Sequence, residues 1–428
     1  MSETFAPVGH HRRLPAPILR VAHLIHSLGP GGAENVLVEL AAVAHCASLE
    51  LVIVALSPAP EPVHAHTLRR MGVPVVELGL ARWDPRAVPR TVVRLREHRV
   101  QLVHTHLKHA DLVGVAAGRW LGLPVISTLH VIEDAPARLI DQYKRTAGLL
   151  ARRRFAACSI AVSTAQREWY RRLSGSEDRL VMLPNGVTDP GPLSAADRTR
   201  LRAELGVAAD DLLVASASLM RPEKGHHLLL DAVRLLQLKP KLTVALAGDG
   251  PMRPQLEARV AGDPALAGRV RFLGYRDDVP ALLGAANIVL HTSLADALPT
   301  TLIHALAVGV PTVATAVGGI PDIVSAETGH VVTTQPQAIA TAIERLAGDR
   351  SERERLGAAA RMRYLECFEA TGWVTRLRSV YESVLEQGVG PTVASSGGGT
   401  MLSRVHSATI RVVEPLLELL GDTFPRRL

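Results

Sequence analysis

The chain has 428 residues, of which 47% are hydrophobic and 21% are charged, so it has the composition of a soluble globular protein with two or three domains. Its net charge of +7 is carried mostly by arginine, but aromatic residues make up only 3%, which argues against a base-stacking nucleic-acid surface. The chain has three cysteines, Cys46, Cys158 and Cys367, which are widely spaced and cannot all form disulfides with one another. We therefore expect a reducing, cytoplasmic location. We expect no signal peptide and no transmembrane helix, and a disordered segment over residues 1–17.

Apolar strands alternate with helical segments over residues 18–190. Strands are predicted at residues 18–25, 51–56, 73–78, 102–105, 125–129, 160–163 and 181–183. This alternation is typical of βαβ units, so residues 18–190 are expected to form an α/β domain with a parallel sheet. Ligands of such sheets bind at the carboxyl ends of the strands. Gly31 and Gly32 follow the first strand and precede a helix, where backbone can approach a ligand closely, although a tight turn explains them equally well.

Three histidines, His104, His106 and His130, lie at or just beyond predicted strand ends. We place His104 and His106 on opposite faces of their strand, so that at most one of them enters a crevice, and no cysteine or carboxylate cluster completes a set of metal ligands. A metal site is therefore not expected. His130 is the best candidate for a functional side chain, and a satisfied surface histidine is the alternative.

Residues 134–154 form a basic helical segment that allows two interpretations. Its basic residues are Arg138, Lys144, Arg145 and the three consecutive arginines at positions 152–154. The segment is either a solvated helix face or a surface that meets anionic lipid headgroups.

A second α/β domain is expected over residues 191–365, after a proline- and glycine-containing linker. Strands are predicted at residues 213–217, 242–247, 270–273, 288–290 and 312–315. Lysine is rare in this chain, and Lys224 stands before Gly225 at a strand-to-helix turn, which favours an anionic ligand. Pro299 is placed at the first position of a helix, so the backbone N–H groups of Thr300 and Thr301 are predicted to face a diphosphate.

The C-terminal part is divided into two segments. A helix over residues 366–387 is expected to cross back to the first domain. Residues 388–428 are expected to form a Gly/Ser linker and an amphipathic tail, which lies on a membrane or a partner, packs on its own domain or stays loose.

Eight short motifs, in this order, give the chain a resemblance to a known family. They are GGAE (31–34), HTH (104–106), TLH (128–130), PNGV (184–187), RPEKG (221–225), AGDGP (247–251), FLGY (272–275) and the segment 293–324. Together they resemble the retaining glycosyltransferases of family 4. The resemblance covers residues 18–387 and implies the GT-B fold, an α/β architecture of two Rossmann-like domains that face each other across a cleft. It implies a sugar nucleotide bound mainly by the second domain and an acceptor bound by the first.

The resemblance assigns roles to individual residues. Gly31 and Gly32 match the glycine loop near the donor phosphate and the acceptor, and His130 matches the histidine near the reacting sugar. Lys224 matches the lysine that neutralises the diphosphate leaving group. Thr300 and Thr301 fall where backbone amides of the family meet that diphosphate. Cationic side chains then take the place of a metal ion, and no cofactor is expected.

Three positions depart from the family pattern. The family pairs two glutamates eight residues apart, and here these positions hold Asp296 and His304. Asp296 keeps a carboxylate that would contact the sugar or its phosphate, whereas His304, on the ribose side, offers only an imidazole. The position of the family's phosphate-binding arginine is Leu219, and Arg221 is the nearest substitute.

The sequence therefore predicts a retaining hexosyltransferase-type enzyme that moves a sugar from a nucleotide-diphosphate donor to a glycan or lipid-linked acceptor. A non-catalytic GT-B subunit that binds a partner enzyme or a glycan is one alternative, and a sugar-nucleotide epimerase of the same fold is another. The nucleotide, the sugar and the acceptor are not specified by the sequence. Contact with the inner face of a membrane stays open, and no nucleic-acid partner is expected.

Overall fold

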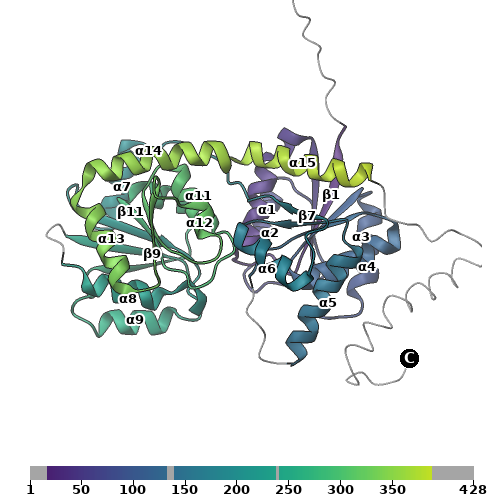
Figure 1. The fold of residues 1–428 in the computed structure, drawn as a ribbon, viewed down its shortest axis with the longest axis horizontal. Helices are drawn as coiled ribbons and strands as arrows, with labels where there is room; N and C mark the ends of the chain where they lie inside the picture. Colours follow the sequence, from purple (N-terminus) through teal and green to yellow (C-terminus); the bar gives the residue numbers. More distant parts are fainter. Residues whose placement is uncertain (1–16, 133–138, 238–240, 388–428) are drawn as a thin grey trace, which may run out of the picture.

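The computed structural model describes residues 17–132, 139–237 and 241–387, which form two α/β domains side by side (Figure 1). The predicted disordered segment at residues 1–17 falls almost entirely outside the described residues, and the predicted linker and tail at 388–428 fall outside them completely. Each domain is built around one sheet in which all neighbouring strands are parallel. This architecture confirms the predicted fold class.

The first domain contains a seven-stranded sheet in the order β3-β2-β1-β4-β5-β6-β7. Its strands are β1 (Leu19–Ile25), β2 (Leu49–Ala55), β3 (Val75–Glu77), β4 (Leu102–His106), β5 (Val125–Thr128), β6 (Cys158–Ala161) and β7 (Leu180–Met182). Its helices are α1 (Gly32–Val43), η1 (Ala44–Ala47), α2 (Val63–Arg70), α3 (Ala87–Glu97), α4 (Lys108–Leu121), α5 (Leu139–Phe155) and α6 (Thr164–Ser174).

The second domain contains a six-stranded sheet in the order β10-β9-β8-β11-β12-β13. Its strands are β8 (Leu212–Ala217), β9 (Leu242–Ala247), β10 (Val270–Gly274), β11 (Ile288–His291), β12 (Thr312–Thr315) and β13 (Gly329–Val332). Its helices are α7 (Ala195–Glu204), η2 (Pro222–Lys224), α8 (His226–Leu235), α9 (Arg253–Ala261), α10 (Val279–Ala285), α11 (Thr300–Ala307), α12 (Ile320–Ile323), α13 (Pro336–Gly348) and α14 (Arg350–Cys367).

Strands in the middle of both sheets are buried on both faces, because helices cover each face. In β1, Leu19, Val21 and Ile25 pack into the core on one face, whereas Ala22 and Leu24 pack into the core on the other. A strand covered in this way reads as a continuous apolar run, which is why these strands were visible in the sequence.

The strand order reverses once in each sheet, and this reversal determines where a ligand can bind. β1 lies between β2 and β4 in the first sheet, and β8 lies between β9 and β11 in the second. The chain leaves β1 and β4, or β8 and β11, toward opposite faces of the sheet, and in sheets of this kind ligands usually bind at the carboxyl ends of these two strands. The loops that follow β1, β8 and β11 are the ones that carry Gly31, Lys224 and Asp296.

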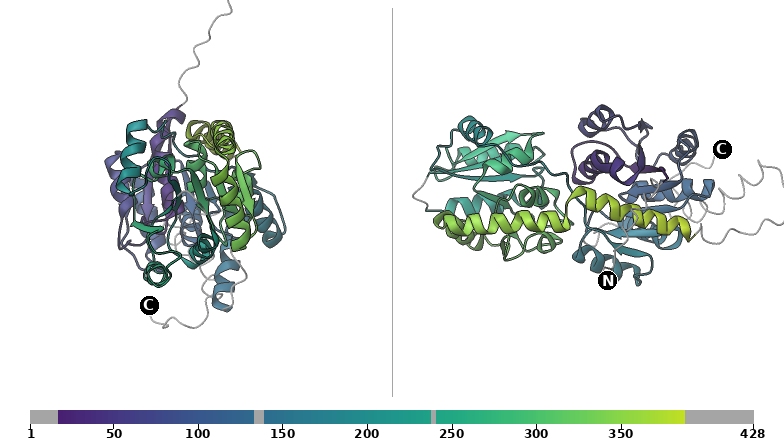
Figure 2. Two further views of the ribbon diagram at one scale, coloured as in Figure 1. Left: turned by 90° about the vertical axis from the view of Figure 1, so that its left-hand side faces the viewer. Right: turned by 90° about the horizontal axis from the view of Figure 1, so that it is seen from above.

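The C-terminal helix α15 (Ala370–Glu386) packs on the first domain, although it follows the second domain in sequence. Figure 2 shows α14 and α15 following one another along one side of both domains. Trp373, Leu377 and Tyr381 of α15 are buried in the same core as β1 and α1. The chain therefore passes between the domains twice, once near Thr188 and once between α14 and α15.

Several elements were not predicted from the sequence. The strands β1 to β12 lie within a few residues of the predicted positions, but β13 was missed, as were α6, α7, α9, α10 and the short helix α12. β13 has only four residues and begins Gly-His, so it lacks the apolar run by which the other strands were recognised. Among the described residues, no helix combines the length and apolar character needed to span a membrane.

Candidate active site

Lys224 and Asp296 lie together at the carboxyl edge of the second sheet. Lys224 ends η2 in the loop that follows β8, and Asp296 lies in the loop that follows β11. The Lys224 ammonium donates a hydrogen bond of 2.6 Å to Oδ2 of Asp296, and both side chains are largely buried. The two residues are 72 positions apart in sequence, and they meet because β8 and β11 are neighbours in the sheet.

The Asp296 carboxylate is held in its charged form by three donors. Burial alone would raise the pKa of Asp296, but a hydrogen bond from His291 and the charge of Lys224 hold this pKa well below its usual value. Nε2 of His291 lies 3.2 Å from Oδ2 of Asp296, and the Ser293 hydroxyl donates to the same oxygen at 3.0 Å. His291 and Ser293 were not predicted as site residues, although both follow directly after the apolar run of β11.

The loops after β8 and β11 pack so closely that one position in the first loop must be glycine. Gly225 has a φ of +65°, and a Cβ atom there would lie 2.0 Å from the carbonyl oxygen of Thr292. The Thr292 hydroxyl in turn donates to the Gly225 carbonyl at 3.1 Å. This contact fixes the position of Lys224, the residue before Gly225, relative to the loop that carries Asp296.

Helix α11 begins beside this pair, one residue later than predicted. Pro299 is the N-cap residue, with a non-helical ψ of 112°, and Thr300 is the first helical residue. The prediction that Pro299 occupies the first helical position is therefore wrong, because its carbonyl already accepts the first helical bond, from Leu302 at 3.0 Å. The N–H groups of Thr300 and Thr301 precede that bond and lie at the positive end of the helix dipole. The Thr301 hydroxyl donates to the Ala217 carbonyl and ties the helix start to the end of β8.

The first domain contributes a carboxylate that lies close to the second domain. The Glu34 side chain folds back over its own helix start, so that a Cβ atom on Gly31 would lie 2.1 Å from Oε2 of Glu34. Burial raises the pKa of Glu34 to about 6, although its own backbone N–H and the charge of Arg221 act in the opposite direction. Arg221 of the second domain is thus close enough to Glu34 to act on it electrostatically. Gly32 faces open space.

His130 lies at the carboxyl edge of the first sheet, two residues after β5. Its Nε2 atom is 2.8 Å from Nδ1 of His106, and its ring is partly exposed. Burial, together with the charge of Arg152, lowers the pKa of His130 to about 4, so the ring is neutral at physiological pH. The contact with His106 is compatible both with a functional role and with the alternative of a satisfied histidine, so the role of His130 stays a prediction.

The placement of His104 and His106 on opposite strand faces is wrong. Residues two apart in a strand share a face, and the two rings stack with centroids 4.5 Å apart. Within the described residues, His23 joins them in a group in which one ring nitrogen from each histidine lies within 4.8 Å of the others, so the trio has the composition of a metal site. The argument from strand faces against a metal therefore fails, and the absence of a metal stays a prediction.

His304, which was predicted on the ribose side of the donor, pairs with a residue of the first domain. Its Nε2 atom lies 3.2 Å from Oε1 of Glu39 on α1, and both side chains are almost completely buried. The other carboxylate oxygen of Glu39 accepts hydrogen bonds from the backbone N–H and the hydroxyl of Thr188, each at 2.7 Å. Sequence reasoning missed Glu39, although a glutamate between Val36, Leu40 and Val43 on the apolar face of α1 is an unusual residue for a core position.

Comparisons with known proteins identify the family and the fold of the chain. The model of the "Glycosyltransferase Family 4" family matches residues 30–189, and the model "Glycosyl transferases group 1" matches residues 197–363. The crystal structure of HepE from Anabaena in complex with UDP and glucose superposes with a TM-score of 0.75 at 25% identity, over 85% of this chain and 100% of HepE.

Two curated bacterial relatives are D-inositol 3-phosphate glycosyltransferases. The one from Streptomyces avermitilis is 28% identical over 64% of this chain, and the match spans 62% of that relative, which is less than two thirds of its length. The one from Xylanimonas cellulosilytica is 30% identical over 63% of this chain and 70% of its own length. The two family models follow one another along the chain and divide between the two domains. The chain therefore belongs to the family 4, group 1, glycosyltransferases.

Proposed function

We propose that this protein transfers a sugar from a nucleoside-diphosphate donor to an acceptor, with retention of anomeric configuration. The observation that carries the proposal is the contact of Lys224 with Asp296 beside the start of α11, at the strand-order reversal of the second sheet. The proposal is supported by HepE, a structure of the same fold that binds UDP and glucose.

The chemistry of this transfer requires the stabilisation of a diphosphate leaving group. As the bond between the sugar and the diphosphate breaks, negative charge grows on the leaving oxygen. In our proposal the Lys224 ammonium, the Arg221 guanidinium and the N–H groups of Thr300 and Thr301 neutralise this charge. The Asp296 carboxylate orients Lys224 and lies on the sugar side, and His130 contacts the reacting sugar from the first domain.

The acceptor and the location are further parts of the proposal. We propose a glycan or a lipid-linked saccharide as acceptor, and the phosphorylated polyol named for the two curated relatives is the next class to test. The three cysteines are unpaired in the structure, which supports a reducing cytoplasmic location. Contact with the inner face of a membrane would bring a lipid-linked acceptor to the first domain.

Calorimetric titration with UDP-sugars and GDP-sugars tests the donor class, and NMR of the product tests the stereochemistry. We expect binding of one nucleotide class and a product with the anomeric configuration of the donor. Absence of both donor binding and donor hydrolysis would support the non-catalytic subunit instead. That alternative draws support from His304, whose imidazole is paired with Glu39. A changed sugar on the nucleotide, without acceptor, would indicate an epimerase.

The substitution Lys224→Ala is predicted to lower kcat/KM by about 10²–10³, the usual effect of removing one donor from a preorganised anion site. Steady-state kinetics measures this change, and circular dichroism shows whether the fold is retained. Lys241→Ala is the matched control, because Lys241 is exposed and lies at the amino end of β9, on the opposite edge of the sheet. Equal activities of the two variants would contradict the role of Lys224.

A further inference from the structure

Three histidines form a hydrogen-bonded chain inside the first domain. His23 lies on β1, His106 lies at the end of β4, and His130 follows β5. Their side chains occupy the sheet face covered by α1 and α15, where the neighbouring positions of β1, including Val21 and Ile25, are apolar. His23 and His106 are almost completely buried, and His130 is partly exposed at the carboxyl edge. The chain therefore leads from the candidate active site into the core.

The contacts within this chain are short, and neighbouring rings are only moderately tilted against each other. Nε2 of His130 is 2.8 Å from Nδ1 of His106, and Nε2 of His106 is 2.9 Å from Nδ1 of His23. The ring planes of His23 and His106 differ by 19° at a centroid distance of 5.2 Å, and those of His106 and His130 by 35° at 5.0 Å. These distances are those of N–H···N hydrogen bonds between imidazoles.

The three rings must share one direction of donation. Burial lowers the pKa of His23 to about 3, lowers that of His130 to about 4 and holds that of His106 well below its usual value, so all three rings are neutral. A neutral imidazole has one N–H donor and one lone pair. Each ring therefore donates through one nitrogen and accepts through the other, and the tautomer of one ring dictates the tautomers of the other two.

The buried end of the histidine chain, at His23, distinguishes between the two possible directions of hydrogen-bond donation. No described residue offers a hydrogen-bond partner to the buried Nε2 of His23, which lies next to a cavity of about 10 Å³ that is lined by His104, Thr128 and Asn185 among others. An unpaired N–H donor is rarer in protein interiors than an acceptor with an unused lone pair. The favoured direction therefore leaves the lone pair at Nε2 of His23 and puts an N–H on Nδ1 of every ring.

We propose that the His23–His106 pair fixes His130 as the Nδ1–H tautomer, so that His130 presents a hydrogen-bond donor to the active site. His23 and His106 are then positioning residues for His130. The tautomer assignment stands on the geometry of the chain and on the burial that keeps the rings neutral, and it does not depend on the proposed function. Donation by His130 to an oxygen of the reacting sugar rests on the proposed function.

A metal ion held by His23, His104 and His106 is the competing explanation of the cluster. The hydrogen bonds of His104 oppose it, because its two nitrogens already contact the Tyr381 hydroxyl and the Thr128 hydroxyl, each at 2.7 Å. Both nitrogens of His106 are used in the chain. A metal would have to break one of the two bonds of His106 and one of the bonds of His104.

Nitrogen-15 NMR of the full-length protein labelled at histidine tests the assignment directly. Long-range couplings between ring nitrogens and carbon-bound protons distinguish the Nδ1–H tautomer from the Nε2–H tautomer. The chain has 18 histidines, so the His130 resonances are identified by their loss in His130→Gln. We expect the Nδ1–H form at pH 7.5. An Nε2–H form, a charged ring or an averaged signal would overturn the proposal.

The variants His23→Leu and His104→Gln separate the chain from the cluster around it. Without His23, we expect His130 to gain the Nε2–H form and kcat to fall roughly five- to tenfold at unchanged donor KM, the effect of one hydrogen bond. His104→Gln alters an equally buried neighbour outside the chain and should leave the His130 tautomer unchanged. Equal effects of both variants on the tautomer would overturn the proposal.

Elemental analysis and titration of the wild-type protein with Co²⁺ complete the test. We expect no stoichiometric metal and no visible absorption band of protein-bound Co²⁺, and one bound ion per chain would overturn the proposal. If the protein transfers no sugar from any donor, the proposed function fails, and the NMR result still decides the tautomer assignment.

Discussion

At the scale of single residues, burial of a charged side chain in the candidate site lowers the free energy of unfolding. Glu34 is the clearest case, because its carboxylate is buried against Gly31 and its pKa is raised from 4.5 to about 6. A folded-state pKa above the unfolded one means that the folded protein binds more protons between these two values. The free energy of unfolding therefore falls as the pH rises from about 4.5 to 6, and it stays lowered above that range.

The substitution Glu34→Gln is predicted to raise the free energy of unfolding at pH 7.5 by about 1–2 kcal/mol, because a shift of one pKa unit corresponds to roughly 1.4 kcal/mol. The gain should shrink as the pH falls and should vanish below about pH 4.5, where the carboxyl group is protonated in both states. Urea unfolding at several pH values measures this dependence.

Glu61→Gln is the control for this series, because Glu61 is exposed on the loop before α2. We expect its free energy of unfolding to stay within about 0.5 kcal/mol of wild type. A gain in Glu34→Gln that does not depend on pH would mean that burial of the charge is not the cause.

The sequence indicated several of the site residues, but it did not indicate all of their partners. Lys224 stood out because lysine is rare and because it precedes a glycine after a strand. Lys224 contacts Asp296 because β8 and β11 are neighbours in the second sheet. The alternation of strands and helices in the sequence predicts that these two strands are neighbours only if the sheet is wound in two directions from its centre. The contact of His304 with Glu39 depends on how two domains pack, and no local pattern carries that information.

At the scale of elements, α5 shows how a basic segment divides between structure and surface. Arg152 is buried, and its guanidinium donates to Oδ2 of Asp111 in α4, with an Nε–Oδ2 distance of 2.9 Å. The hydroxyls of Thr105 and Ser127 donate to the other oxygen of Asp111. Neither of the two interpretations predicted for this segment describes Arg152, which faces the sheet. Arg154 is exposed, so it is compatible both with a solvated helix face and with a surface that meets anionic lipid headgroups.

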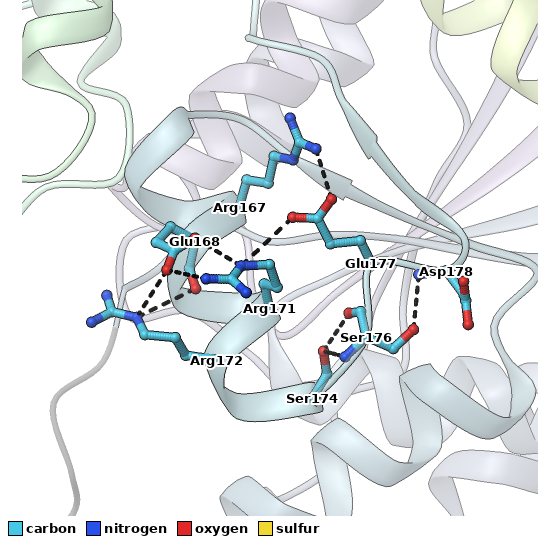
Figure 3. A network of polar contacts seen from close by, with 8 residues as sticks. All are labelled: Arg167, Glu168, Arg171, Arg172, Ser174, Ser176, Glu177 and Asp178. Atoms are coloured by element: carbon cyan, nitrogen blue, oxygen red, sulfur yellow. Dashed lines mark hydrogen bonds and ion pairs between the residues drawn. The ribbon is translucent and has the colours of Figure 1, made fainter.

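Surface arginines elsewhere are paired with acidic residues, as Figure 3 shows for α6. Arg171 donates to Glu168 in the same helix at 2.7 Å, and it lies 3.7 Å from Glu177 in the loop that follows. Arg167 donates to Glu177 at 2.7 Å. Exposed pairs of this kind add little stability, but they neutralise much of the local charge. The positive net charge is thus a weak guide to a partner on this face.

The substitution Arg152→Ala is predicted to lower the free energy of unfolding by about 3–5 kcal/mol, because it leaves the Asp111 carboxylate buried without a counter-charge. Thermal and urea unfolding measure the loss. Combining Arg152→Met with Asp111→Asn should recover much of it, since no unpaired charge then remains. Arg154→Ala, at an exposed position of the same helix, is the surface control. If Arg152→Ala and Arg154→Ala unfold at the same urea concentration, the ion pair in the structure does not contribute to stability.

The elements that the sequence missed have a physical cause at this same scale. α6 carries three arginines and one glutamate among its eleven residues, so its apolar period is short and easily overlooked. The start of the helix is defined by Ser163, whose side chain accepts a hydrogen bond from the Gln166 backbone N–H, and its end by Gly175 in the left-handed region. Packing on neighbouring elements then stabilises the helix, and single-sequence periodicity does not report such packing.

At the scale of the whole molecule, the two domains are joined by a buried polar contact as well as by the chain. Glu39 of α1 contacts His304 of α11 and Thr188 of the connecting segment. The Thr164 backbone N–H also donates to the Asp322 carboxylate across the domains. These contacts hold α11 and α12 against the first domain.

The substitution His304→Glu, which restores the residue type of the family pattern, is predicted to destabilise this protein by roughly 3–5 kcal/mol, because it buries a second carboxylate beside Glu39. In the double variant with Glu39→Gln, the amide can donate to the introduced carboxylate and still accept from Thr188, so most of the stability should return. A double-mutant cycle in urea measures this coupling.

The same double variant tests the predicted ribose contact. If position 304 faces the ribose, the double variant should bind the sugar-nucleotide donor more tightly than wild type, as measured by calorimetry. The single variant Glu39→Gln should not show this gain. An additive cycle with no recovery would mean that residues 39 and 304 do not interact in solution.

The placement of α15 has a consequence for the order in which the protein is made. The last strand of the first domain, β7, ends at Met182. Six buried side chains of the same domain core, from Ala370 to Val384, belong to α15 and emerge from the ribosome roughly 190 residues later. At about 5–20 residues per second, translation leaves that domain incomplete for about 10–40 s. During this interval its uncovered apolar face, including the histidine chain, is exposed to the cell, so the nascent chain should depend on chaperones until synthesis is nearly finished.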